Sequence, residues 1–95
     1  MIYVLAQLRI HQRDVYERYV QRFMATLAGT QGRLLAADEA PVVVEGDWDR
    51  DKVVLIAFPD EEAFSAWQSS AAYQAIIGDR RAGADASIIL VHGLG

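Results

Sequence analysis

The segment that most constrains the fold is Lys52–Phe58, KVVLIAF, which is apolar at both odd and even positions after its first residue. Alternate side chains of a β-strand point to opposite faces of the sheet, so this strand has to be covered on both faces. Residues 86–93, ASIILVHG, have the same character and predict the last strand. The chain is therefore expected to build a sheet whose two faces both carry bulky apolar side chains.

The first third of the chain predicts a strand followed by a helix. Residues 1–10 alternate in part between two faces. Asp14 and Glu17 resemble a capping box at a helix start. The apolar residues that follow recur at helical spacing and predict a buried stripe of Tyr16, Tyr19, Val20, Phe23, Met24 and Leu27.

The middle of the chain contains two further strand-like runs, residues 32–38 and 41–48. Pro41 cannot donate to a strand ladder, so we expect it at an edge or a kink. Residues 46–51, GDWDRD, predict a turn because they combine glycine with three aspartates.

The last third predicts a second helix that is interrupted once. Pro59 and Asp60 open it, and Ser70 can cap a continuation after the break at the two serines. The side chains expected on its buried side are Ala63, Phe64, Trp67, Tyr73, Ile76 and Ile77.

The resulting order, β-α-β-β-α-β over residues 1–95, predicts one α+β domain with a ferredoxin-like, four-stranded antiparallel sheet. Both helices would cover the same face of that sheet, where they meet Val54, Ile56 and Phe58. The alternate residues of this strand, Val53, Leu55 and Ala57, would point to the opposite face of the sheet. An uncovered apolar patch of this size is unusual for a monomer, so we expect a homodimer that packs sheet to sheet.

Composition excludes several classes of function. Thirteen acidic and 9 basic residues give a formal net charge of −4, which disfavours nucleic acid as a partner. The absence of cysteine excludes thiolate chemistry. No signal peptide, membrane-spanning segment or phosphate-binding glycine loop is found, so we expect a cytoplasmic protein without a membrane partner. We expect no cofactor.

The combination of VVVEGDW, VVLIAF, AFSAWQSSAAYQAI and DRRAGA resembles the DUF1330 family of small proteins of unknown function. The resemblance covers nearly the whole chain, and its most specific parts are Glu45–Trp48 and the spacing of Trp67, Ser70 and Tyr73. It implies a dimeric α+β barrel fold and implies no reaction.

The chain departs from the family pattern at four places. Ala37, Asp38 and Glu39 stand where an arginine and two glycines are expected. Ala57 and His92 each stand where a glutamate is frequent, and Ala71 replaces a common proline. Any family activity that needs that arginine and glutamate is therefore in doubt for this chain.

Glu45 is the candidate for acid–base catalysis or ligand binding, with Trp48 as an apolar wall. A carboxylate between valines and an indole can have a raised pKa, which is useful near neutral pH. The alternative is ordinary turn chemistry, in which Gly46 permits the turn and Asp47 and Asp49 bind turn amides.

The first strand offers a second candidate set. Tyr3, Gln7 and Arg9 share one parity, and an arginine there can orient a carboxylate or carbonyl. Arg33 completes the expected ligand-binding residues. The alternative for Arg9 is a solvent-exposed strand end or an ion pair between subunits.

The remaining chemistry-bearing residues favour structural roles. The first and last strands are expected to run antiparallel side by side, with His11 and His92 at opposite edges of the sheet, so we predict no metal site. Trp67 and Tyr73 are expected in the core, and Ser70 lacks a histidine that would activate it. Arg80 and Arg81 are expected at a solvated helix end, paired with Asp79.

Two functions stay open at this point. One is a non-catalytic homodimer that binds a small organic molecule or has a packed interior. The other is a cofactor-independent enzyme, such as a monooxygenase or isomerase, with a cavity lined by Tyr3, Gln7, Arg33 or Glu45. A core filled by Leu5, Leu35, Val53 and Leu55 would leave no room for a substrate.

Overall fold

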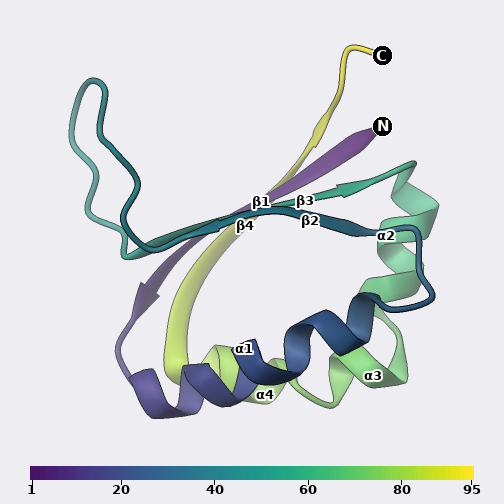
Figure 1. Ribbon diagram of the computed structural model, residues 1–95, viewed down its shortest axis with the longest axis horizontal. Coiled ribbons are helices and arrows are strands. Elements are labelled where there is room, and N and C mark those ends of the chain that lie inside the picture. The colour runs from purple at the N-terminus through teal and green to yellow at the C-terminus, as the bar shows by residue number, and fades with distance from the viewer.

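The computed structural model describes residues 1–95 as one antiparallel sheet with helices on one face (Figure 1). The strands are β1 (Ile2–Ile10), β2 (Arg33–Asp38), β3 (Lys52–Phe58) and β4 (Ala84–His92). The helices are α1 (Arg13–Leu27), α2 (Glu61–Gln68), α3 (Ala71–Gln74) and α4 (Ile77–Gly83). The strand order is β2-β3-β1-β4, which is the predicted ferredoxin-like arrangement.

The two central strands divide the apolar side chains between the faces as predicted. Val4 pairs with Ile56 and Ile2 with Phe58, and these residues belong to the core beneath the helices. Leu5 pairs with Leu55 and points to the opposite face. All four helices lie on one side, so this opposite face, here called the open face, is not covered by the chain itself (Figure 1).

The first helix buries the expected stripe, with one exception. Tyr16, Tyr19, Phe23 and Leu27 are buried, whereas Met24 is 58% exposed. The predicted capping by Asp14 is wrong. The helix begins at Arg13 and no side chain caps it. Its entry is fixed by Gly83, whose carbonyl accepts bonds from the amides of His11 and Gln12.

The caps of the second half are confirmed. Asp60 Oδ1 accepts from the Ala63 amide at 2.8 Å, and Ser70 Oγ accepts from the Tyr73 amide at 3.2 Å. Ser70 thereby separates α2 from α3 at the predicted break. None of the four helices has the length and hydrophobicity that crossing a bilayer needs.

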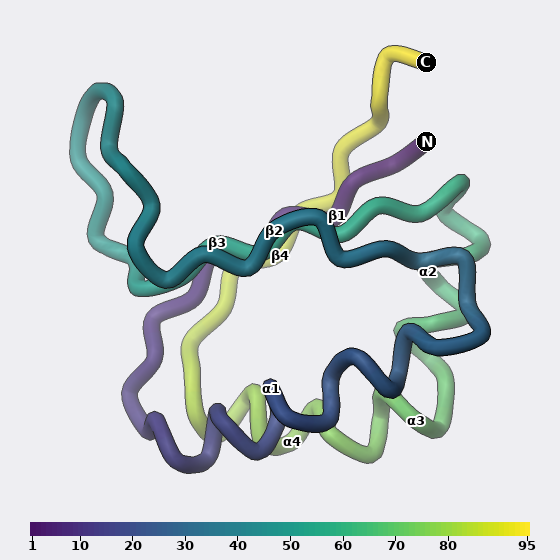
Figure 2. Tube along the Cα trace, in the orientation of Figure 1, coloured from purple at the N-terminus to yellow at the C-terminus, as the bar shows by residue number.

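The prediction that Val42–Val44 form a strand is wrong. Residues 39–51 leave the sheet as an arm that projects away from the helices (Figure 2). Val42 and Val44 are 88% and 95% exposed, because no neighbouring strand lies beside them. Gly46 has φ 85°, the left-handed conformation that glycine adopts readily, where the arm bends. Pro41 lies in the arm, outside the sheet, as expected.

The base of the arm is anchored to β1. The Asp51 amide donates to the Leu8 carbonyl at 2.8 Å, and Asp51 Oδ2 accepts from the Ile10 amide at 2.7 Å. These two bonds bring the chain back into β3 and set which β3 residues face the helices, beginning with Lys52 opposite Leu8.

Candidate functional site

A cavity of about 180 Å³ lies between the helix-covered face of the sheet and the helices. Its walls come from all four strands and from α1, α2, α3 and α4. Eighteen of the 22 lining residues are hydrophobic, and the other four are Lys52, Gln68, Arg80 and Arg81. No acidic residue is among them, so the charged groups around the cavity are all cationic although the chain is acidic overall.

Lys52 is the buried charge of this cavity. It is 5% exposed, and its Nζ lies 4.9 Å from the centroid of the Tyr16 ring, a cation–π distance. No carboxylate lies within salt-bridge distance of it. Burial lowers the pKa of Lys52, and the more distant Glu39 and Glu17 only partly oppose that shift.

Arg80 is a second cation that lines the cavity. Its Nε is buried and has no hydrogen-bond partner, which is rare for a buried polar atom. The predicted pairing of Asp79 with Arg80 and Arg81 is wrong. Asp79 accepts instead from Arg18 of α1, at 3.2 Å, because α1 packs along α4. Arg80 is therefore left facing the cavity and the tyrosines of α1.

Three tyrosines, Tyr16, Tyr19 and Tyr73, line the same cavity. Burial raises the pKa of Tyr16 to about 12, with Glu39 adding to the shift and Arg13 and Arg80 opposing it. The hydroxyls of Tyr19 and Tyr73 share a hydrogen bond of 2.9 Å. Burial, reinforced by Tyr73, raises the pKa of Tyr19 well above its ordinary value. The phenols of Tyr16 and Tyr19 are consequently neutral hydrogen-bonding groups at physiological pH.

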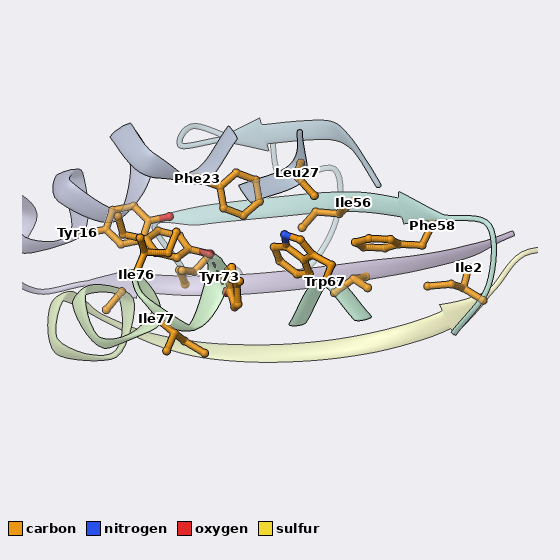
Figure 3. Packing of buried hydrophobic residues seen from close by; sticks show 14 residues of the cluster. Ile2, Tyr16, Phe23, Leu27, Ile56, Phe58, Trp67, Tyr73, Ile76 and Ile77 are labelled. Carbon is orange, nitrogen blue, oxygen red and sulfur yellow. Dashed lines mark hydrogen bonds between the residues drawn. The ribbon is translucent and has the colours of Figure 1, made fainter. Parts of the chain in front are cut away.

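The other end of the cavity is aromatic and apolar. Trp67 packs against Tyr73 with ring centroids 4.1 Å apart and against Phe23 at 5.9 Å. Its Nε1 donates to Thr26 Oγ1 at 3.0 Å, so the indole presents no unpaired polar atom. Figure 3 shows Tyr16 at one end of this layer and Phe58 at the other, with Trp67 between them. The predicted core roles of Trp67 and Tyr73 are confirmed.

The residues singled out from the sequence lie elsewhere. Tyr3, Gln7 and Arg9 point from β1 to the open face, and Arg33 reaches it from β2. Arg9 pairs with Asp49 of its own chain at 2.6 Å. None of these residues lines the cavity. Their role in ligand binding stays a prediction, and it concerns the opposite side of the sheet.

Glu45 and Trp48 lie in the arm. Both are exposed, and they border an open hollow together with Pro41, the three arm valines, Asp47 and Val53. Val53 belongs to the open face, so this hollow adjoins that face and not the cavity beneath the helices. The structure thus brings Glu45, Asp47 and Trp48 together, apart from the buried cations.

The two histidines lie apart, as the strand order predicts. His11 Nε2 lies 3.5 Å from an Asp85 carboxylate oxygen, and His92 bonds to Glu61 at the other end of the sheet. No three His, Asp or Glu side chains gather where a metal ion could be held.

Sequence reasoning missed Lys52, Arg80 and Arg81 as cavity residues. A signal for Lys52 was present, because it shares the parity of Val54, Ile56 and Phe58, which were placed toward the helices. A lysine whose side chain points to the same face as these residues is predicted to bury its amine beneath the helices. Arg80 gave no such signal, since its direction depends on how α4 packs against α1.

Residues 1–94 match the family described as domain of unknown function, DUF1330. The chain belongs to the DUF1330 family. The predicted family is therefore confirmed. No curated protein matches this DUF1330 sequence.

Solved structures share the fold of this DUF1330 chain at low sequence identity. A protein of unknown function from Rhodopseudomonas palustris, RPA0582, has a TM-score of 0.82 at 18% identity, covering 99% of this chain and 82% of the other. SnoaB, a cofactor-independent oxygenase from Streptomyces nogalater, has a TM-score of 0.71 at 17% identity, covering 99% and 93%. A dimeric ferredoxin-like protein of unknown function from Jannaschia sp. has a TM-score of 0.73 at 17% identity, covering 97% and 98%.

The departures from the family pattern have visible consequences in this DUF1330 chain. Ala37 lines the cavity, where a larger residue would occupy part of the space. Glu39 binds Arg13 at 2.7 Å, and this bond holds the pKa of the Glu39 carboxyl below its usual value. Ala57 is buried on the open face between Tyr3 and Arg33.

Proposed function

We propose that this protein is a homodimer that binds a small organic molecule in the cavity between sheet and helices. The observation that carries the proposal is the cavity of about 180 Å³ with its mostly apolar lining. Cavities of about 150 Å³ with apolar walls are known to bind benzene. One substituted six-membered ring is therefore the size of ligand that fits.

The shape and chemistry of the cavity support binding over a purely structural interior. Protein interiors are close-packed, and a void of this size forfeits contacts along its whole lining. An aromatic wall opposite a few polar groups is the usual composition of a ligand pocket. Two observations support the proposal that the protein is a homodimer. The Jannaschia protein of the same fold is dimeric, and the open face of this chain exposes apolar side chains.

Native mass spectrometry of the protein as purified from cells tests both parts. We expect a dimer mass that carries a small-molecule adduct. In Ala6→Leu, which adds bulk to the cavity wall, the adduct should be lost. Ala72→Leu adds the same atoms at an exposed position of α3 and should keep it.

Three results would count against the proposal. An adduct that survives Ala6→Leu lies somewhere other than this cavity. If the wild-type protein carries no adduct, and NMR titration with substituted benzenes shifts no cavity resonance, the cavity is not a ligand site. A monomer mass at micromolar concentration would overturn the dimer.

The enzymatic alternative places Glu45 as an acid or base in the hollow beside Trp48. Its support is that both side chains and Asp47 border one hollow next to the open face, where a second copy would lie. Glu45→Gln should then abolish turnover of whatever compound is released from the purified protein, and leave binding in the cavity unchanged. Unchanged turnover in that variant would remove Glu45 from catalysis.

A further inference from the structure

We propose that the ligand of this cavity is an organic anion whose negative group binds between Lys52 and Arg80 while its apolar body packs against Trp67 and Phe23. This inference rests on the proposed function, since it names the chemical class that the cavity selects. It is carried by the distribution of charge around the cavity.

The first step is the buried amine. Lys52 is 5% exposed and projects from the helix-facing parity of β3 into an apolar layer. Burying an ammonium group without a carboxylate partner destabilises the folded chain, because the group loses its hydration and gains no compensating charge. The ring of Tyr16 compensates only in part, because a π face offers a weaker interaction than an anion. The buried amine of Lys52 therefore has no anionic partner that would offset its loss of hydration.

The second step is the neighbouring guanidinium. Arg80 Nε is buried without an acceptor, and no acidic side chain lines the cavity to supply one. Lys52 and Arg80 line the same cavity, and neither has an acidic lining residue as a partner. A carboxylate, phenolate or enolate oxygen would accept from both groups, and such charge-assisted bonds are stronger than neutral ones.

The third step fixes the orientation. The cations lie near Tyr16, at the start of β3 and on α4, whereas Trp67, Phe64 and Phe23 occupy the opposite part of the lining. A ligand with a charged group at one end and an aromatic or branched aliphatic body at the other matches this division. A doubly charged ligand does not fit, because the distal wall offers no further cation.

A pair of matched probes tests the inference: 4-ethylbenzoate and the neutral 4-ethylbenzamide, which have nearly the same shape. We expect NMR titration of the wild-type protein to show ~tenfold tighter binding of the carboxylate than of the amide. A difference of this size corresponds to one charge-assisted hydrogen bond. Lys52→Met should remove most of this preference while amide binding is retained. Arg22→Met, a cation removed from the exposed side of α1, should leave the preference intact.

The outcomes separate the two proposals. Equal affinity for carboxylate and amide in the wild type would overturn the anion preference and leave the ligand site standing. A preference that persists in Lys52→Met and in Arg80→Met would also overturn it. If neither probe shifts resonances of cavity residues, the proposed function fails, and this inference fails with it.

Discussion

The two faces of the sheet both carry apolar side chains but differ in what covers them. On the helix-covered face, Phe58 is completely buried and Ile56 is 5% exposed. On the open face, Ile89 and Val91 are 55% and 41% exposed. The difference shows that the chain has enough helix to cover one face only. Apolar residues on the other face remain available for a second copy.

The faces also differ in where their polar groups lie. The open face is apolar near the chain termini and becomes polar toward the arm, where Gln7, Arg9, Asp85 and Ser87 gather. On the covered face, the one charged residue that is buried is Lys52. A gradient toward solvent is ordinary for an interface rim. A single buried cation is not ordinary for a core, which is why the covered face contains the candidate site.

The largest expected effect comes from truncation on the covered face. Phe58→Ala should lower the free energy of unfolding by about 3–5 kcal/mol, because it empties the position where Phe64 and Trp67 pack. Leu55→Ala, on the open face of the same strand, is the matched control. Urea denaturation at low protein concentration should show a smaller loss for Leu55→Ala, and equal losses would contradict the difference between the faces.

A charge on the open face should act on assembly and not on the fold. Ile89→Lys is expected to weaken the proposed dimer by about 3 kcal/mol, since it would bury an unpaired ammonium at the proposed interface. The monomer should unfold within about 0.5 kcal/mol of wild type, because Ile89 is half exposed there. Light scattering measures the mass, with Gln21→Lys on the exposed side of α1 as control. A dimer that survives Ile89→Lys would move the interface elsewhere.

The smallest expected effect concerns Lys52 and depends on pH. Burial lowers its pKa below the ordinary value of 10.5, so the unfolded chain binds this proton more tightly than the folded chain. The contribution of Lys52 to stability therefore rises as pH approaches 10.5 and is least favourable near neutrality. Lys52→Met should be more stable than wild type by about 1–2 kcal/mol at pH 7.

That advantage of Lys52→Met should shrink toward pH 10.5. Tyr16 has the opposite dependence, because its pKa rises from 10.0 to about 12 on folding and stability is lost above pH 10. Comparing the two proteins at each pH cancels the contribution of Tyr16. A constant difference between them from pH 7 to 10.5 would mean that Lys52 is not desolvated.

Much of the fold could be predicted because local patterns and tertiary structure agree there. The two-sided strands, the stripe of α1 and the caps at Asp60 and Ser70 follow from periodicity and short-range hydrogen bonding. Val42–Val44 show where this reasoning fails. Three valines favour a strand, but a strand also needs a neighbour to pair with, and the arm has none.

Periodicity along the chain was enough to predict the element order and the need for cover on both faces of the sheet, and the resemblance of specific motifs identified the family. The parity of β3 already carried a signal for Lys52, but the rest of the candidate site depends on tertiary structure. The packing of α4 against α1 pairs Asp79 with Arg18 and leaves Arg80 at the cavity. Such proximity between side chains distant in sequence depends on helix and sheet packing, and no local pattern encodes it.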